Sequence, residues 1–150
     1  MRKTALSLAL FGLAATLWAA DPFVGTWKMN PAKSAYSLPL DKSYTITIAA
    51  QDNGCKVVQD FVTADEKALR RSWSAKYDGK FYPVTAPDAD AISLKKPTPN
   101  TVEYVLKKNG KEAWSGRAAV SADGRTMTDK GGGKDANGKP FTYSLFMERQ

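Results

Sequence analysis

The alternation of apolar and polar residues predicts a chain built almost entirely from β-strands. Tyr44, Ile46 and Ile48 alternate with small hydroxyl side chains, and the same period of two recurs in most later segments. Strands with this pattern have one dry face and one wet face. The predicted strands span roughly 23–29, 43–50, 55–62, 68–77, 81–84, 91–96, 101–108, 111–121, 125–130 and 140–149.

The turns between these segments favour hairpins. Asn or Asp followed by Gly tolerates the positive φ angles that a two-residue hairpin requires. This dipeptide occurs five times, at Asn53-Gly54, Asp78-Gly79, Asn109-Gly110, Asp123-Gly124 and Asn137-Gly138. The three glycines at 131–133 suggest a flexible or bulged stretch between the last two strands.

Consecutive hairpins without a crossover helix predict an antiparallel meander. A sheet of this size twists, and closing it removes exposed edges. The fold class predicted is therefore all-β: an antiparallel up-and-down β-barrel of about 8–10 strands, with a two-sheet sandwich as the alternative. The one irregular connection begins at Asn30-Pro31, a helix N-cap followed by a good first helical residue, and predicts one short helical turn after the first strand.

The first and last strands carry residues suited to closing such a barrel. Gly25 stands two residues before Trp27 on the same face of the first strand, and Arg149 ends the apolar face of the last strand. If the two strands pair, the guanidinium can lie across the indole, a contact that contributes about 0.5–2 kcal/mol. The alternative is a buried Trp27 with a solvated Arg149.

Residues 1–20 have the pattern of a secretory signal peptide. Arg2 and Lys3 precede an apolar stretch, and Ala19-Ala20 supplies small residues for cleavage before Asp21. The apolar core is too short to span a membrane stably. We expect a mature domain of residues 21–150, exported to the periplasm or secreted, without a transmembrane span.

Charge and cysteine content narrow the possible partners. The chain has 22 Lys and Arg against 15 Asp and Glu, a formal charge of +7, but the cations are scattered rather than gathered in a stripe with aromatic residues. We therefore expect no nucleic-acid partner. Cys55 is the single cysteine, so an intramolecular disulfide is impossible. The chain is expected to be a monomer.

Catalytic chemistry is not expected. The sequence contains no histidine, which removes Ser-His-Asp and Cys-His arrangements and most zinc sites. Asp88 and Asp90 flank Ala89, but two acids are too few for calcium, and we interpret them as ordinary turn residues. We predict neither enzyme activity nor a metal or other cofactor.

The remaining chemistry lies on the inward faces of the strands. Arg71 shares its face with Leu69 and Trp73, and a charge on an apolar face is costly unless it is paired. It either reaches water at the barrel mouth, which we favour, or meets an acidic head group inside. The predicted cavity-lining residues are Tyr44, Ile46, Leu69, Arg71, Trp73, Tyr104, Trp114 and Tyr143. Their aromatic character suits a flat apolar ligand.

Several blocks of the sequence resemble the calycins, the superfamily of lipocalins and fatty-acid-binding proteins. The opening segment 23–28 and the ending 146–149 are similar to calycin first and last strands. The blocks 25–34, 75–80 with 82–84, 87–90 and 121–126 are similar to a largely uncharacterised group of exported bacterial lipocalin-like proteins. The resemblance implies a barrel with an internal cavity. The family's Arg-x-Tyr carboxylate grip is replaced here by Leu145 and Met147.

Two functions follow from these observations. The first is an exported binding or carrier protein for a small apolar or lipid-like ligand. The second is a protein-interaction module of the cell envelope, such as an enzyme inhibitor, in which side chains fill the barrel. An internal cavity distinguishes the two, and ten strands favour one.

Overall fold

The computed structural model describes residues 20–150, so nearly all of the predicted signal peptide lies outside the described residues. Regular structure begins five residues further on. The elements are β1 (Gly25–Met29), η1 (Pro31–Lys33), β2 (Ala35–Tyr36), β3 (Ser43–Gln51), β4 (Gly54–Val62), β5 (Ala68–Lys76), β6 (Asp78–Thr85), β7 (Ala91–Thr98), β8 (Thr101–Lys108), β9 (Lys111–Val120), β10 (Thr126–Lys134) and β11 (Pro140–Arg149).

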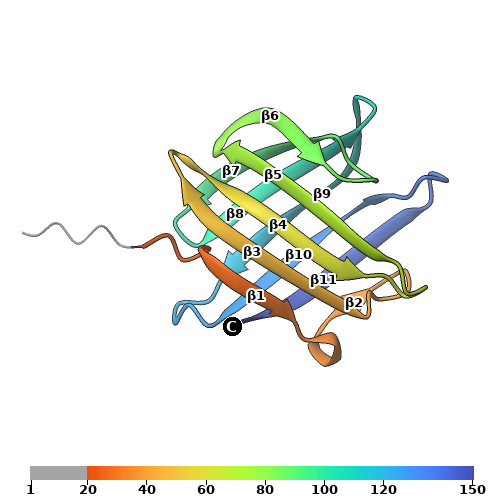
Figure 1. Ribbon diagram of the computed structural model, residues 1–150, viewed down its shortest axis with the longest axis horizontal. Coiled ribbons are helices and arrows are strands. Elements are labelled where there is room, and N and C mark those ends of the chain that lie inside the picture. The colour runs from red at the N-terminus through yellow and green to blue at the C-terminus, as the bar shows by residue number, and fades with distance from the viewer. Residues whose placement is uncertain (1–19) are drawn as a thin grey trace, which may run out of the picture.

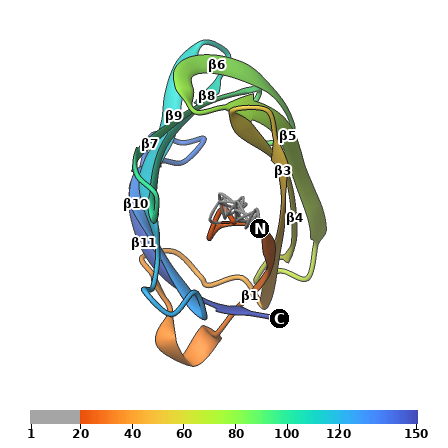
Figure 2. The same cartoon turned by 90° about the vertical axis from the view of Figure 1, so that its left-hand side faces the viewer.

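The strands form one closed antiparallel barrel (Figures 1 and 2). From β3 to β11 each strand pairs with the next, and β1 closes the ring by pairing with both β3 and β11. The two-residue β2 is an addition at the edge of β11. This arrangement confirms the predicted all-β up-and-down barrel, and the sandwich alternative is wrong. The predicted helical turn is also present as η1, where the Asn30 side chain accepts a hydrogen bond from Ala32 N–H.

The local turn chemistry explains the meander. Each of the five Asn-Gly or Asp-Gly dipeptides contains a residue with positive φ, and both central residues of Asn109-Gly110 do so. The glycines at 131–133 behave differently from the expected bulge. They pair in register with β9 on one side and β11 on the other. Added side chains would collide with neighbouring backbone, so these glycines permit close strand contact.

Residues 20–24 cover one end of the barrel, where Figure 2 shows them crossing the ring. Phe23 is buried in the core, and its carbonyl accepts a hydrogen bond of 2.9 Å from Trp27 Nε1. Asp21 forms an ion pair of 2.8 Å with Lys96 of β7. The opposite end carries the 30–42 connection and the turns after β4, β6, β8 and β10 (Figure 1).

Trp27, Arg149 and Gly25 meet where β1 joins β11. Trp27 is completely buried and lies opposite Arg149 in the strand register. The guanidinium carbon lies 4.2 Å from the centroid of the indole ring. Its nitrogens donate to the carbonyls of Pro22, Val24 and Gly124 at 2.6–2.7 Å. Arg149 therefore ties the N-terminal segment and the β9–β10 turn to the closing strand.

Gly25 is needed for this contact. Its φ is +139°, and a Cβ there would overlap the Arg149 guanidinium. We expect Gly25→Ala to lower the free energy of unfolding by about 1–3 kcal/mol, because alanine is strained at this φ and must displace the cation. Urea unfolding measures the change. Gly110→Ala is the control: φ is +75° there, but nothing lies within 4 Å. Equal costs for the two variants would contradict a special role for Gly25.

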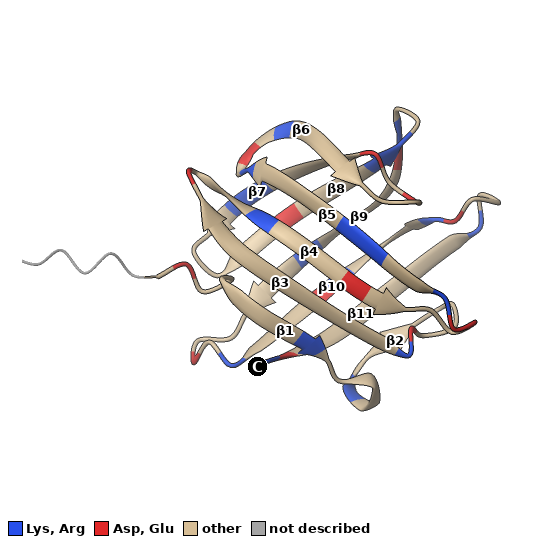
Figure 3. Cartoon of the chain, viewed as in Figure 1, with Lys and Arg blue, Asp and Glu red and all other residues tan. Residues whose placement is uncertain are grey.

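Charged side chains are distributed over the outer surface. In Figure 3, Lys and Arg positions are interspersed with Asp and Glu positions over the strands and turns. Arg70 and Asp60, for example, form an exposed pair between β4 and β5, with atoms 2.7 Å apart. Among residues 20–150, no helix has the length and apolar character required to cross a bilayer.

Candidate functional site

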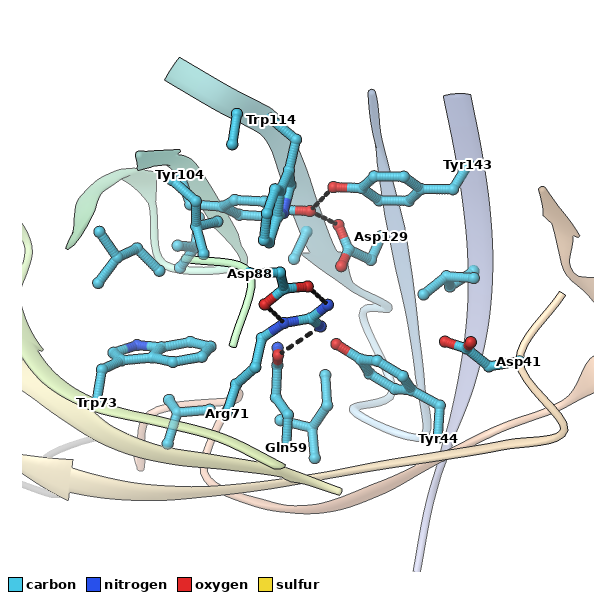
Figure 4. A pocket seen from close by; sticks show the side chains of 18 of the residues that line it. Asp41, Tyr44, Gln59, Arg71, Trp73, Asp88, Tyr104, Trp114, Asp129 and Tyr143 are labelled. Atoms are coloured by element: carbon cyan, nitrogen blue, oxygen red, sulfur yellow. Dashed lines mark hydrogen bonds and ion pairs between the residues drawn. The ribbon is translucent and has the colours of Figure 1, made fainter. Parts of the chain in front are cut away.

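A cavity of about 710 Å³ occupies the interior of the barrel. Ligand pockets for small organic molecules typically measure about 300–1,000 Å³, so this one has room for such a molecule. Most of its wall is apolar, because period-two strands turn every second side chain inward. Apolar lining residues include Ile46, Ile48, Val57, Ile92, Leu94, Val102, Leu106, Met127 and Leu145. Figure 4 shows the polar groups that interrupt this wall.

Arg71 lies inside the cavity rather than in bulk water. Its side chain is only 15% exposed, and its guanidinium makes a two-pronged ion pair with Asp88, with 2.9 Å between Nε and Oδ1. Nη1 also donates to Gln59 at 3.4 Å, and the cation lies over the rings of Phe61 and Trp114. Arg71 therefore neither reaches bulk water nor needs an acidic head group of a ligand, because the carboxylate of Asp88 neutralises it.

The environment of Arg71 preserves its charge. Burial alone disfavours a charged guanidinium, but the hydrogen bonds that Arg71 donates to Asp88, together with the nearby Tyr44 and Asp41, outweigh this effect and raise the pKa of Arg71. Asp88 belongs to the connection between β6 and β7 and is 42% exposed. The sequence analysis interpreted Asp88 as an ordinary turn residue and did not predict its contact with Arg71.

A second polar group joins β8, β10 and β11. Asp129 of β10 is only 8% exposed and accepts a hydrogen bond of 2.6 Å from the Tyr104 hydroxyl. The Tyr104 hydroxyl also hydrogen-bonds the Tyr143 hydroxyl. Gly116 and Gly131 make room for these hydroxyls, because a Cβ on either glycine would overlap them. Burial raises the pKa of Asp129 to about 7, although the Tyr104 hydrogen bond acts in the opposite direction.

Two further polar groups face the cavity. Asp41 lies half-buried in the connection before β3, and burial raises the pKa of its carboxyl group. Trp73 of β5 lines the opposite wall, and its buried indole Nε1 reaches no acceptor among the described residues. A ligand oxygen placed beside Trp73 would satisfy that donor.

The cavity gathers most of the sequence-predicted lining residues but not all of them. Tyr44, Ile46, Arg71, Trp73, Tyr104, Trp114 and Tyr143 line it. Leu69 does not: it stands opposite Phe61 in the ladder, near the turn that ends β4, and packs against the core cluster instead. The predicted barrel-closure residues lie at the β1–β11 seam described above.

The sequence analysis did not predict four polar residues that line the cavity: Asp41, Gln59, Asp88 and Asp129. Asp129 shares the face of Met127, and Gln59 shares the face of Val57 and Phe61. A polar residue on an apolar face was therefore the available signal for Asp129 and Gln59. Asp41 and Asp88 lie in connections, where no alternation shows which way a side chain points.

Comparisons with known proteins identify the fold. No protein-family model matches the sequence, and no curated protein matches it either. Among solved structures, the zebrafish ileal bile acid-binding protein in complex with cholic acid is similar, with a TM-score of 0.51 and 7% sequence identity. The match covers 86% of this chain and 99% of that one. The barrel thus has the same kind of fold as that bile acid-binding protein.

Proposed function

We propose that this protein binds a small, largely apolar molecule inside its barrel and acts as a binding or carrier protein. The observation that carries the proposal is the cavity of about 710 Å³, with an apolar wall and a few inward polar groups. The similar zebrafish structure is a bile acid-binding protein holding cholic acid, which supports a binding role for a barrel of this shape. A protein-interaction module with a filled barrel is less well supported, because its interior would have to be packed.

Three further features belong to the same proposal. Export to the periplasm or secretion is supported by the signal-peptide pattern of residues 1–20. A role in binding rather than catalysis fits a chain without histidine. A monomer without a nucleic-acid partner fits the interspersed charges of the outer surface.

A fluorescent probe tests whether the protein binds an apolar molecule. N-phenyl-1-naphthylamine is flat, neutral and apolar, and its emission rises when it leaves water. We expect it to bind one-to-one with micromolar affinity, equivalent to about −8 kcal/mol. Calorimetric titration supplies the stoichiometry. If the titration gives no heat and the probe emission does not rise at micromolar concentrations, and if simple decyl compounds do not bind either, the proposed function is overturned.

Tryptophan emission reports on the place of binding. Trp73 and Trp114 line the cavity, whereas Trp27 is completely buried beneath Arg149. Binding of a non-fluorescent ligand such as decan-1-ol should therefore change the emission of Trp73 and Trp114 and spare Trp27. The emission change should shrink in Trp73→Phe and Trp114→Phe. An undiminished change in a Trp73→Phe/Trp114→Phe double variant would place the ligand elsewhere.

A further inference from the structure

The charges inside the cavity are unbalanced. Among the described residues, Arg71 is the one cation on the inner wall of the cavity. Asp88 already neutralises it by accepting two hydrogen bonds. Asp41 and Asp129 then remain as acids without a cationic partner of their own in the ion pairs of the structure. The inner wall therefore carries more acidic than basic side chains.

The charges at the open end do not remove this imbalance. Lys108, Lys111 and Lys134 line the mouth together with Glu112 and Asp135. These residues lie on the β8–β9 and β10–β11 hairpins; Lys111, Glu112 and Lys134 are exposed, so water and salt screen their effect on the interior. They can influence how a ligand approaches, but the acids inside the cavity determine which head group binds there.

The geometry around Asp129 shows where a positive head group would fit. One oxygen of Asp129 accepts the Tyr104 hydrogen bond, and Figure 4 shows the other turned toward the centre of the cavity. The rings of Tyr104 and Tyr143 and the hydroxyl of Tyr44 surround the same space. Carboxylate oxygens and aromatic faces are the groups that hold ammonium ions in proteins.

We propose that the ligand is a cationic amphiphile, an apolar body carrying a protonated amine whose ammonium group lies beside Asp129. This inference rests on the proposed function and specifies its ligand class. An anionic head group would face Asp129 and Asp41 and would find Arg71 already paired. A cation instead gains a charge-assisted hydrogen bond and keeps Asp129 ionised.

The pKa of Asp129 gives the inference a pH signature. Since this pKa is about 7, raising the pH from 6 to 8 ionises the carboxyl group and should strengthen amine binding. The other groups facing this space are Tyr44, Tyr104 and Tyr143, with pKa values raised by burial, and the Arg71–Asp88 pair with Asp41. The affinity of a neutral alcohol should change little over the same range.

Three ligands with the same apolar body test the head group. Decylamine, decan-1-ol and decanoate are titrated below their aggregation limits against bound N-phenyl-1-naphthylamine. We expect decylamine to bind about tenfold more tightly than decan-1-ol, and decanoate to bind most weakly. If the probe binds but decylamine has no advantage over the alcohol, or decanoate binds best, the inference fails and the proposed function stands. If neither the probe nor any decyl compound binds, the proposed function fails.

Variants separate the two polar groups. Asp129→Asn should abolish the advantage of decylamine and leave decan-1-ol within about threefold of its original affinity. Asp88→Asn should release Arg71 and raise the affinity for decanoate about tenfold. Asp52→Asn, on the exposed β3–β4 turn, is the control and should change neither ratio. A decylamine advantage that persists in a folded Asp129→Asn protein would overturn the inference.

Discussion

Replacing Trp27 with alanine is expected to lower the free energy of unfolding by about 3–5 kcal/mol, as for other large buried aromatic residues. The indole is completely buried, and Nε1–H donates to the Phe23 carbonyl. Its loss leaves a void at the seam between β1 and β11 and unties the N-terminal segment. Urea unfolding followed by circular dichroism measures the change.

Replacing Arg149 tests the other side of the same contact. Arg149→Ala removes the cation–π contact and three hydrogen bonds to backbone carbonyls, which together should cost about 2–4 kcal/mol. Because the two side chains touch, the double variant should lose less than the sum of the single losses, by about 0.5 kcal/mol or more. Strictly additive losses would contradict a closure that depends on Trp27 and Arg149 as a unit.

The second large effect is a dependence of stability on pH caused by Asp129. Its pKa is raised in the folded state to about 7, from the ordinary value of 3.8, so the folded protein binds more protons than the unfolded chain between these values. The free energy of unfolding should therefore fall as the pH rises from about 4 to 7, by at most about 1.4 kcal/mol per pH unit. Unfolding at closely spaced pH values measures the slope.

Asp129→Asn isolates that contribution. An amide cannot ionise, so the variant should lose most of the slope and be more stable than the original protein at pH 8, while differing little at pH 4. Asp41, whose pKa burial also raises, leaves a smaller slope of the same sign. Asp52→Asn should retain the full dependence. A stability that rises between pH 4 and 7 in the unaltered protein would be the opposite of what burial of Asp129 implies.

The parts of the fold that sequence could predict are those that local rules determine. Alternation identified the inward faces of β3 and β5, and the Asn-Gly and Asp-Gly pairs identified the hairpin turns. The pairing of Trp27 with Arg149 could be anticipated because the first and last strands of a closing barrel must meet, and both alternate. For the inward faces and the turns, the signal lies within a few residues along the chain.

The site itself depends on contacts between distant segments. Arg71 and Asp88 are 17 residues apart and meet because the connection after β6 folds back over the cavity mouth, which no periodicity reveals. Leu69 has the same parity as Arg71 yet misses the cavity, since its position along the barrel axis matters as well as its face. The glycines at 131–133 look flexible in sequence but pair on both sides.

The last strand contributes only uncharged side chains to the cavity wall. Leu145 lines the cavity and Met147 is completely buried in the core, so this part of the last strand turns apolar side chains inward. The cation inside the cavity is Arg71 of β5, and it is already paired with Asp88. The fold is thus similar to that of the bile acid-binding protein, whereas the proposed head group follows from this chain's own polar residues.

The central claim is that a ligand lies inside the barrel, and intermolecular nuclear Overhauser effects test it most directly. In a one-to-one complex with N-phenyl-1-naphthylamine, the probe's aromatic protons should show effects to the methyl groups of Ile92, Leu106 and Leu145, which line the cavity. Methyl groups of Val58 and Val105, which do not line it, should show none. Effects confined to Val58 or Val105 would place the probe on the outer surface and contradict the account.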